Sequence, residues 1–399
     1  MDPFFSSSQD FLIIIVLPLM VMTLRSAWIE RQTLWDANVT ARDRDLLMRI
    51  TMFVLMPIVV FLHECGHAAA ILQFGGKIAE FHYGILWGYV VPSGIFTPEQ
   101  ILTIYLAGNV VEILCGLLAL LAAFIVTSPP VVAVLIYLAI WSISGTAIVY
   151  AMMSTLGMYG DWVAIYNTSV RSWIPYIGTI HAVIVVLLLW ALYGKAPRLW
   201  FVCRTRPLWA KKRSALLADL NSHPTAEGYL DLAWLYYEAG LDSFAQEACE
   251  KSLAIEPQFA DPLYLQAWLQ VNRGKVAKAQ ELLTALSTNP RASAILKARS
   301  LMSVGQLAED QIKKQTHNGP VPPEMWKVPL EAFTAASLAE PELCDPRFYR
   351  ARTLNKAGLH TLALAELEDL SNCKWLDPKL HDLVHVEIGL ARKLEAPKQ

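Results

Sequence analysis

Two histidines and a glutamate lie close together in an apolar stretch of the chain, which reads FLHECGHAAA over residues 61–70. His63 and His67 are four residues apart, so a helix would place both imidazoles on one face with Glu64 beside them. Two neutral imidazoles can hold a zinc ion, and a neighbouring glutamate can shuttle the proton of a zinc-activated water. The pattern predicts a hydrolytic metal site with His63 and His67 as ligands and Glu64 as general base and acid.

The apolar surroundings of this motif favour a bound ion. Three ionisable groups in a membrane-spanning helix are costly unless they are paired or liganded. The alternative explanation is that both histidines only hydrogen-bond a neighbouring helix.

A catalytic zinc needs a third protein ligand and one open position. The acidic residues downstream in the apolar half are Glu80, Glu99, Glu112 and Asp161. Asp161 lies in LGMYGDWVAIY, just beyond the fourth expected membrane span, and the second and fourth spans run in the same direction. Their ends therefore meet on one side of the bilayer, and we expect Asp161 to complete the ligand set. An ordinary helix N-cap before WVAIY is the alternative role for this aspartate.

Asn109 and Glu112 are further candidates for the site. They stand three residues apart in LAGNVVEILCGLLALL and so share one face of the expected third span. A carboxyl group at that depth is a candidate functional group. We expect the pair to position the substrate, with Glu112 as an alternative zinc ligand. A protonated glutamic acid bonded to a neighbouring helix is the competing explanation.

Composition divides the 399-residue chain into two halves. Residues 1–193 carry 7 Lys/Arg and 11 Asp/Glu, whereas residues 194–399 carry 26 and 24. The first half is apolar and charge-poor, and the second has the composition of a soluble domain. The formal net charge of −2 gives no footprint for nucleic acid, and the six cysteines contain no CxxC pair that would indicate a zinc knuckle.

The first half contains five apolar runs long enough to cross about 30 Å of hydrocarbon. They cover roughly residues 4–24, 47–72, 100–127, 130–156 and 173–193. The first run lacks a basic leading segment and a small-residue cleavage site, so we expect an anchor and not a signal peptide.

Residues 195–213 hold seven basic and no acidic residues, which is typical of a cytoplasmic segment that touches anionic lipid headgroups. A solvated linker is the alternative. We expect an integral multi-pass membrane protein, embedded in a lipid bilayer, with a cytoplasmic C-terminal domain.

A segment between the second and third spans has the pattern of strands. Residues 77–100 read KIAEFHYGILWGYVVPSGIFTPEQ, with alternating and aromatic residues broken by glycine and proline. This pattern favours a short, membrane-associated β-hairpin whose exposed edge could capture an extended peptide.

The second half contains a repeated helix-pair pattern. Residues 225–258 resemble a tetratricopeptide unit, with Gly240 at the turn and Ala245 in the second helix. Gly274 and Ala279 recur at the same offset of 34, and looser echoes surround Gly305 and Gly358. Stacked helix pairs bury a common core and expose a surface that can bind a peptide or protein partner. A spacer without a partner is the alternative.

The first half resembles the site-2 protease family of intramembrane zinc metalloproteases. The resemblance rests on HECGH in one span, an aspartate in a later span, and GNVVE at residues 108–112 between them. It covers roughly residues 45–170 and implies His63, His67 and Asp161 as zinc ligands and Glu64 as the catalytic acid and base. Two features depart from the family: glycine precedes the aspartate as Gly160-Asp161, and Glu112 stands where the family has asparagine.

The sequence therefore predicts an all-α protein with three parts: a transmembrane metalloprotease domain over residues 1–193, a basic linker over 194–224 and a helical repeat domain over 225–399. The expected activity is zinc-dependent cleavage of membrane-protein substrates, with one Zn²⁺ per chain. The alternatives are a membrane-anchored tetratricopeptide scaffold with a non-catalytic metal site, and a CAAX-type membrane zinc protease that takes Glu112 as its ligand.

Overall fold

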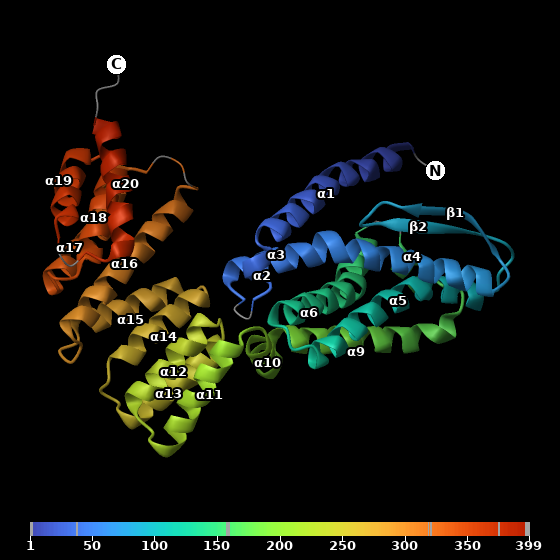
Figure 1. The fold of residues 1–399 in the computed structure, drawn as a ribbon, viewed down its shortest axis with the longest axis horizontal. Helices are drawn as coiled ribbons and strands as arrows, with labels where there is room; N and C mark the ends of the chain where they lie inside the picture. The colour runs from blue at the N-terminus through green and yellow to red at the C-terminus, as the bar shows by residue number, and fades with distance from the viewer. Residues whose placement is uncertain are drawn as a thin grey trace. The chain divides into compact units, whose positions relative to one another are not determined.

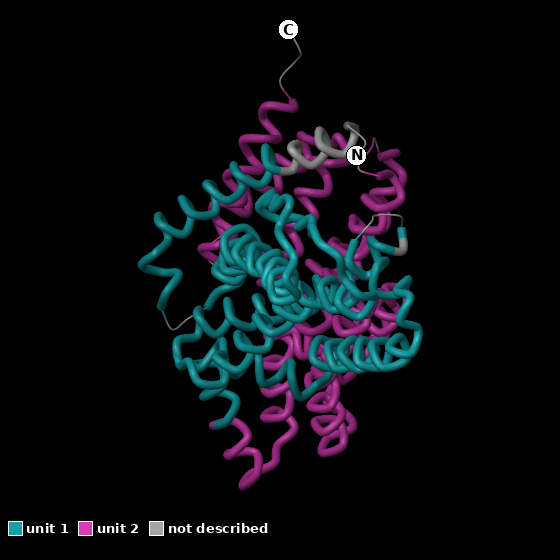
Figure 2. The backbone as a smooth tube through the Cα atoms, turned by 90° about the vertical axis from the view of Figure 1, so that its right-hand side faces the viewer, with its two compact units in different colours: residues 1–214 teal, residues 215–399 magenta. Residues whose placement is uncertain are grey.

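The chain forms an almost entirely helical protein, which confirms the predicted all-α class (Figure 1). The computed structural model describes residues 3–36, 39–156, 160–317, 319, 321–373 and 376–395. It divides into two compact units, residues 1–214 and 215–399, coloured separately in Figure 2. The division falls inside the segment 194–224.

The elements of unit 1, together with the helix α11 that crosses into unit 2, are apolar helices, two π-helical segments and one hairpin among the described residues. In chain order they are α1 (Pro3–Ile29), α2 (Arg31–Leu34), α3 (Ala41–Ile50), η1 (Thr51–Leu55), α4 (Met56–Gln73), β1 (Lys77–Tyr83), β2 (Gly88–Ser93), α5 (Pro98–Ile125), α6 (Pro129–Ser144), η2 (Gly145–Tyr150), α7 (Ala151–Thr155), α8 (Asp161–Tyr166), η3 (Arg171–Trp173), α9 (Ile174–Tyr193), α10 (Lys195–Thr205) and α11 (Pro207–Ser222).

Four helical stretches among the described residues are long and apolar enough to cross a membrane. They are Ala41–Gln73, Pro98–Ile125, Pro129–Ser154 and Arg171–Tyr193, which match the second to fifth predicted spans. The predicted first span, residues 4–24, lies in α1, whose side chains are described only from Ile13 onward. The apolar part of that helix within the described residues, Ile13–Ile29, is shorter than the other four.

Glycines bring the central helices α4, α5 and α6 into close contact. A Cβ at Gly66 of α4 would lie 2.8 Å from the Ala107 carbonyl oxygen of α5. A Cβ at Gly116 of α5 would lie 3.2 Å from the Ala139 carbonyl oxygen of α6. Small residues permit this approach of helix backbones in an apolar bundle, where dispersion contacts stabilise the association. The packing places one face of α5 against the histidine-bearing face of α4.

The predicted β-hairpin is present beside α4. Strands β1 and β2 pair antiparallel from Lys77 opposite Ser93 to Tyr83 opposite Gly88. The Tyr83 hydroxyl donates to the Pro57 carbonyl oxygen at 2.7 Å, and Phe61 of α4 contacts the Tyr83 ring edge-on. These contacts attach the hairpin to the helix that carries both histidines.

The basic segment after the last candidate span is helical. In α10, the Arg204 guanidinium donates to the Ala123 carbonyl oxygen at 2.9 Å and also to the Val126 carbonyl oxygen. The Trp200 ring packs on Phe124, with ring centroids 4.6 Å apart. Arg204 thereby satisfies carbonyls that the end of α5 leaves without a helical partner.

Unit 2 is a succession of helices that mostly pair with their neighbours along the chain. They are α12 (Ala226–Glu238), α13 (Asp242–Ile255), α14 (Asp261–Asn272), α15 (Val276–Thr288), α16 (Ala294–Gln315), η4 (Pro323–Trp326), α17 (Lys327–Ala339), α18 (Cys344–Lys356), α19 (His360–Ser371) and α20 (Pro378–Glu395).

The predicted turn glycines of unit 2 are confirmed at three positions and wrong at one. Gly240, Gly274 and Gly358 separate paired helices with φ of 73°, 73° and 80°, a region in which glycine has no steric penalty. Gly305 instead lies in the middle of α16, where a Cβ would meet the Phe333 ring at 2.6 Å. The glycine there admits an aromatic ring and does not form a turn.

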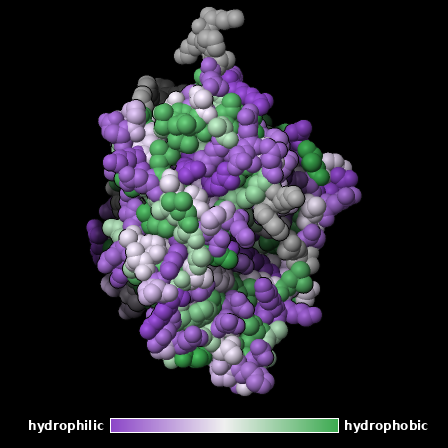
Figure 3. Space-filling view, turned by 90° about the vertical axis from the view of Figure 1, so that its left-hand side faces the viewer, coloured by the Kyte–Doolittle hydropathy of each residue, from purple (hydrophilic) through white to green (hydrophobic). Residues whose placement is uncertain are grey.

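The surface of the repeat helices is mixed in character. Figure 3, which looks onto these helices, shows mostly hydrophilic residues with scattered hydrophobic ones. The buried residues of unit 2 form separate clusters between successive helices, such as Ala267, Ala279, Leu283 and Leu307. This arrangement is that of a helical repeat domain with its own core.

Candidate metal centre

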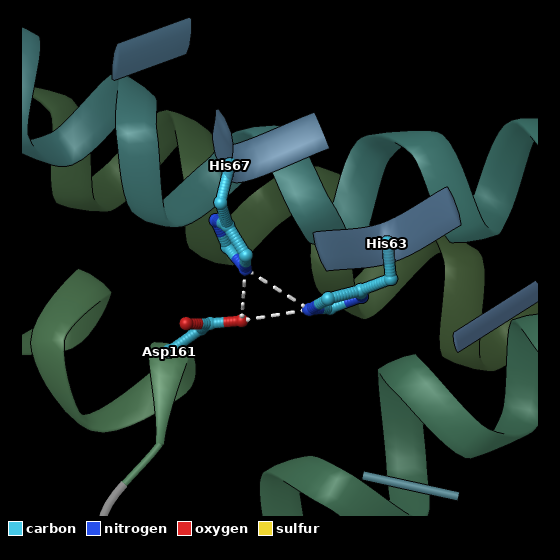
Figure 4. A group of neighbouring side chains, drawn as sticks. All are labelled: His63, His67 and Asp161. Atoms are coloured by element: carbon cyan, nitrogen blue, oxygen red, sulfur yellow. Dashed lines mark hydrogen bonds and ion pairs between the residues drawn. The ribbon is translucent and has the colours of Figure 1, made fainter. Parts of the chain in front are cut away.

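Two histidines on α4 and the first residue of α8 converge inside unit 1 (Figure 4). The Nε2 atoms of His63 and His67 lie 3.0 Å apart. The Asp161 Oδ2 atom lies 3.1 Å from His63 Nε2 and 3.2 Å from His67 Nε2. All three residues are buried. The structure thus brings together the three side chains that the sequence nominated as ligands, although Asp161 is more than ninety positions away.

The far edges of the two imidazoles are each held by an acceptor. His63 Nδ1 lies 3.0 Å from Glu112 Oε2, and His67 Nδ1 lies 2.6 Å from the Ile104 carbonyl oxygen. Both acceptors come from α5. Because a neutral imidazole carries one proton, these contacts place it on Nδ1 in each ring and leave both Nε2 atoms as acceptors.

With both rings neutral and protonated at Nδ1, the two Nε2 atoms and Asp161 Oδ2 face one another as three acceptors. Such a cluster of acceptors is stabilised by a cation. For a tetrahedral zinc with ligands at about 2.0 Å, neighbouring ligand atoms lie about 3.3 Å apart. The observed separations of 3.0, 3.1 and 3.2 Å are close to that value. Two imidazole nitrogens and one carboxylate oxygen form a donor set that suits Zn²⁺.

Gly108 leaves space beside the two nitrogens. A Cβ on this residue of α5 would lie 2.3 Å from His67 Nε2 and 2.6 Å from His63 Nε2. No side chain fits at those distances. The missing side chain keeps the volume next to the ligand atoms open, as an ion or its fourth ligand requires.

Glu64 lies beside the three ligands without joining them. It is 4% exposed, and its Oε2 atom has no hydrogen-bond partner among the described residues. The backbone of strand β2 covers it at Gly88, where a Cβ would lie 2.7 Å from Glu64 Cγ. A buried carboxylate oxygen without a partner is costly unless a ligand or water uses it.

Asp161 does not cap a helix, so its alternative role is wrong. It is the first residue of α8, its N-cap position is Gly160, and no side-chain cap bond forms there. Its carboxylate is directed at the histidines, and Asn109 Nδ2 donates to Oδ2 at 3.5 Å. The Asn109 Oδ1 atom is buried without a partner.

Glu112 occupies a different place from the one expected of it. It contacts His63 Nδ1, on the ring edge opposite the ligand atom, and so cannot share an ion with Nε2. Its carboxyl group is instead bonded to a side chain of the neighbouring helix α4, as in the competing explanation. The sequence analysis also missed Gly108, the Ile104 carbonyl and Tyr150, whose hydroxyl accepts the Asp161 backbone N–H at 3.0 Å. Gly108 begins the GNVVE segment, which was the one signal for it.

Comparisons with known proteins add little to this geometry. No protein-family model matches the chain, and no curated protein matches it. Two crystal structures of MamA are similar to it. One is 16% identical over 43% of this chain and 86% of that chain, with a TM-score of 0.31. The other is 15% identical over 48% and 92%, with a TM-score of 0.29. We draw no inference from similarity at this level.

Proposed function

We propose that the chain is an intramembrane zinc metalloendopeptidase, similar to the site-2 proteases, that cleaves membrane-protein substrates. One observation carries the proposal: three buried lone-pair donors converge beside a fourth residue, Glu64, whose carboxylate has an unpartnered oxygen. The first three suit a metal, and the fourth suits proton transfer. A purely structural site would not require Glu64.

In this proposal each residue has one task. His63, His67 and Asp161 hold the ion, and Zn²⁺ when bound polarises a carbonyl and lowers the pKa of a bound water. Glu64 takes a proton from the attacking water while the water oxygen bonds to the carbonyl carbon of the peptide. Glu64 then gives that proton to the leaving amine nitrogen when the C–N bond breaks. Glu112 and the Ile104 carbonyl keep both imidazoles in the ligating tautomer.

The hairpin and Asn109 are placed to position an extended substrate. Strand β2 lies against Glu64 at Gly88, so a peptide added to the hairpin edge would run past the general base. Asn109 Oδ1 is a buried acceptor without a partner and could accept a peptide N–H. This unpartnered acceptor supports the predicted substrate-positioning role of Asn109.

The rest of the chain fits a membrane protease with a soluble adaptor. The four apolar helices support a multi-pass arrangement. The basic residues of α10 and α11 favour a cytoplasmic location for unit 2. The repeat helices would bind a peptide or protein that brings substrate or controls access.

The two alternative functions have less support. A CAAX-type protease needs a glutamate ligand, and the contact of Glu112 with His63 Nδ1 commits that residue to another role. A scaffold with a non-catalytic metal leaves the buried, unpartnered Glu64 unexplained.

Two substitutions test the proposal directly. We expect Asp161→Ala to reduce zinc in the purified protein to background, because two imidazoles alone hold zinc weakly. We expect Glu64→Gln to retain zinc and to lower cleavage of a co-expressed single-span reporter by at least about 100-fold. Glu99→Gln, an exposed carboxylate at the start of α5, is the matched control. Wild-type zinc content in Asp161→Ala, or continued cleavage by Glu64→Gln, would refute the assignment.

A further inference from the structure

Tyr150 places a phenol beside the ligand set. It is the last residue of the π-helical segment η2, and its ring centroid lies 6.4 Å from that of His63. Its hydroxyl oxygen accepts the backbone N–H of Asp161 at 3.0 Å. The phenol therefore sits at the point where the third candidate ligand enters the site.

The hydroxyl proton of Tyr150 is uncommitted. A tyrosine hydroxyl can accept hydrogen bonds and donate one. Asp161 N–H uses an acceptor position, and among the described residues the O–H itself donates no hydrogen bond. A half-buried donor without a partner, next to a candidate reaction centre, is available to a bound substrate.

Gly160 is shaped to admit this hydroxyl. A Cβ at Gly160 would lie 2.6 Å from the Tyr150 oxygen and 2.7 Å from its nearest ring carbon. The φ of −168° at Gly160 is extended backbone that any residue adopts, so space and not conformation requires the glycine. This explains why glycine precedes Asp161 here, whereas the resembled family has glycine after its aspartate.

The segment that carries Tyr150 is fastened on two sides. Trp162 Nε1 donates to the Thr146 carbonyl oxygen at 2.8 Å. His181 Nε2 lies 2.6 Å from the Ala147 carbonyl oxygen, and its Nδ1 lies 2.8 Å from the Tyr166 hydroxyl. Widened π turns leave backbone groups to be paired by neighbours and occur frequently at functional sites. These contacts fix η2 against α8 and α9, and hence fix Tyr150.

We propose that Tyr150 is a further catalytic residue, whose O–H donates a hydrogen bond to the carbonyl oxygen of the scissile peptide. The inference rests on the proposed function. As the water oxygen bonds to the carbonyl carbon, the π electrons of the C=O bond move onto its oxygen, and Tyr150 stabilises that charge. The water proton passes through Glu64 to the leaving nitrogen, and Tyr150 keeps its own proton throughout.

A positioning role is the competing explanation, since the same hydroxyl also anchors Asp161. The two roles differ in what Tyr150→Phe changes. A residue that only anchors Asp161 affects metal affinity. A donor to the developing charge affects the reaction rate and the binding of a tetrahedral anion even when the site is saturated with zinc.

The experiment compares wild type, Tyr150→Phe, Glu64→Gln and the control Tyr166→Phe, which removes a neighbouring hydroxyl that bonds His181 and not the ligands. The first two readouts are zinc affinity, measured by chelator competition, and cleavage of the single-span reporter. The third is binding of two apolar peptides to the protein in detergent micelles: one peptide carries a phosphinic group in place of one amide, and the other is its unmodified amide parent. For Tyr150→Phe we expect amide binding within twofold of wild type and a modest loss of zinc affinity, because the Asp161 N–H loses its acceptor; cleavage is therefore compared with every variant saturated with zinc. We expect cleavage about 100-fold slower and the phosphinic peptide bound about 10-fold or more weakly.

Each outcome decides a separate point. Cleavage and phosphinic binding at wild-type levels in Tyr150→Phe would overturn the proposal, as would a loss of zinc affinity that accounts for the slower cleavage. A wild-type protein that binds the phosphinic peptide no better than its amide parent would overturn it as well. Continued cleavage by Glu64→Gln would instead refute the proposed function. An inactive Glu64→Gln beside a fully active Tyr150→Phe would remove only the role of Tyr150.

Discussion

At the scale of single residues, the ability of the site to hold a metal depends on which nitrogen of His63 and of His67 carries the proton. Glu112 accepts a hydrogen bond from His63 Nδ1–H, and the Ile104 carbonyl accepts one from His67 Nδ1–H. Both Nε2 atoms then face Asp161 as acceptors. An ionisable residue such as Glu112, buried in an apolar helix, needs a partner of this kind. In the proposed site its contribution would be indirect, since it would hold the His63 ring in a ligating orientation.

Glu112 offers a test with two closely related substitutions. Glu112→Leu removes the acceptor for His63 Nδ1–H and should weaken zinc binding by about 10- to 100-fold, the usual effect of losing a group that orients a ligand. Glu112→Gln keeps an acceptor oxygen on a side chain of the same length, so its zinc affinity should fall less. Chelator competition on the purified proteins measures both. Equal zinc affinity in the leucine variant and wild type would show that Glu112 does not orient His63.

At the scale of elements, glycines set how closely α5 approaches α4 and the ligand atoms. Gly66 lets the two backbones meet, and Gly108 leaves the volume beside the His63 and His67 nitrogens open. Neither position has the positive φ that would require glycine for the backbone itself. The absence of side chains at these points leaves the space between the helices that the proposed metal needs.

Gly108→Ala should abolish zinc binding while the helix remains intact. The added methyl group would occupy the space beside both Nε2 atoms, yet alanine favours a helix over glycine by about 1 kcal/mol. Gly178→Ala in α9 is the matched control, because a Cβ there has nothing within 4 Å. Zinc content and circular dichroism should separate the two effects. Full zinc occupancy in Gly108→Ala would mean that the ion does not use this space.

At the scale of the whole molecule, the chain combines two units whose surfaces differ in polarity. Unit 1 exposes large apolar side chains on its candidate spanning helices. In the fourth of these, Arg171–Tyr193, only 6% of the most apolar stretch is buried. Those faces are suited to lipid. Unit 2 buries its own apolar clusters and carries most of the charge. Helix α11 crosses the boundary between them, and Leu220 near its end lies close to Gly228 of α12.

The repeat unit should therefore fold without the membrane unit. A fragment over residues 207–399, which keeps α11 whole, should be soluble without detergent and show the circular dichroism of a helical protein. Thermal unfolding should be cooperative, because each helix pair packs on the next. The fragment 1–206 should require detergent. Aggregation of 207–399, or a lack of helical signal, would contradict an independent core in unit 2.

The sequence by itself determined the features that depend on local spacing. The i, i+4 relation puts His63 and His67 on one face of any helix, and glycines between periodic segments predicted the turns at Gly240, Gly274 and Gly358. The hairpin followed from alternation and turn residues in the same way. The wrong assignment of Gly305 shows the limit of this reasoning, because a distant ring, Phe333, explains that glycine.

Only the tertiary structure decided which distant groups meet. Asp161 reaches His63 Nε2 because α8 packs beside α5. Glu112 reaches Nδ1 of the same ring because α5 packs against α4 at His63. Tyr150 carried no local signal, and Gly108 had only its place at the start of GNVVE, because their contributions are a hydroxyl and a missing side chain that face another helix. Spacing along the chain fixes the direction of neighbouring side chains. Contacts between separate helices depend on packing that no short stretch of sequence contains.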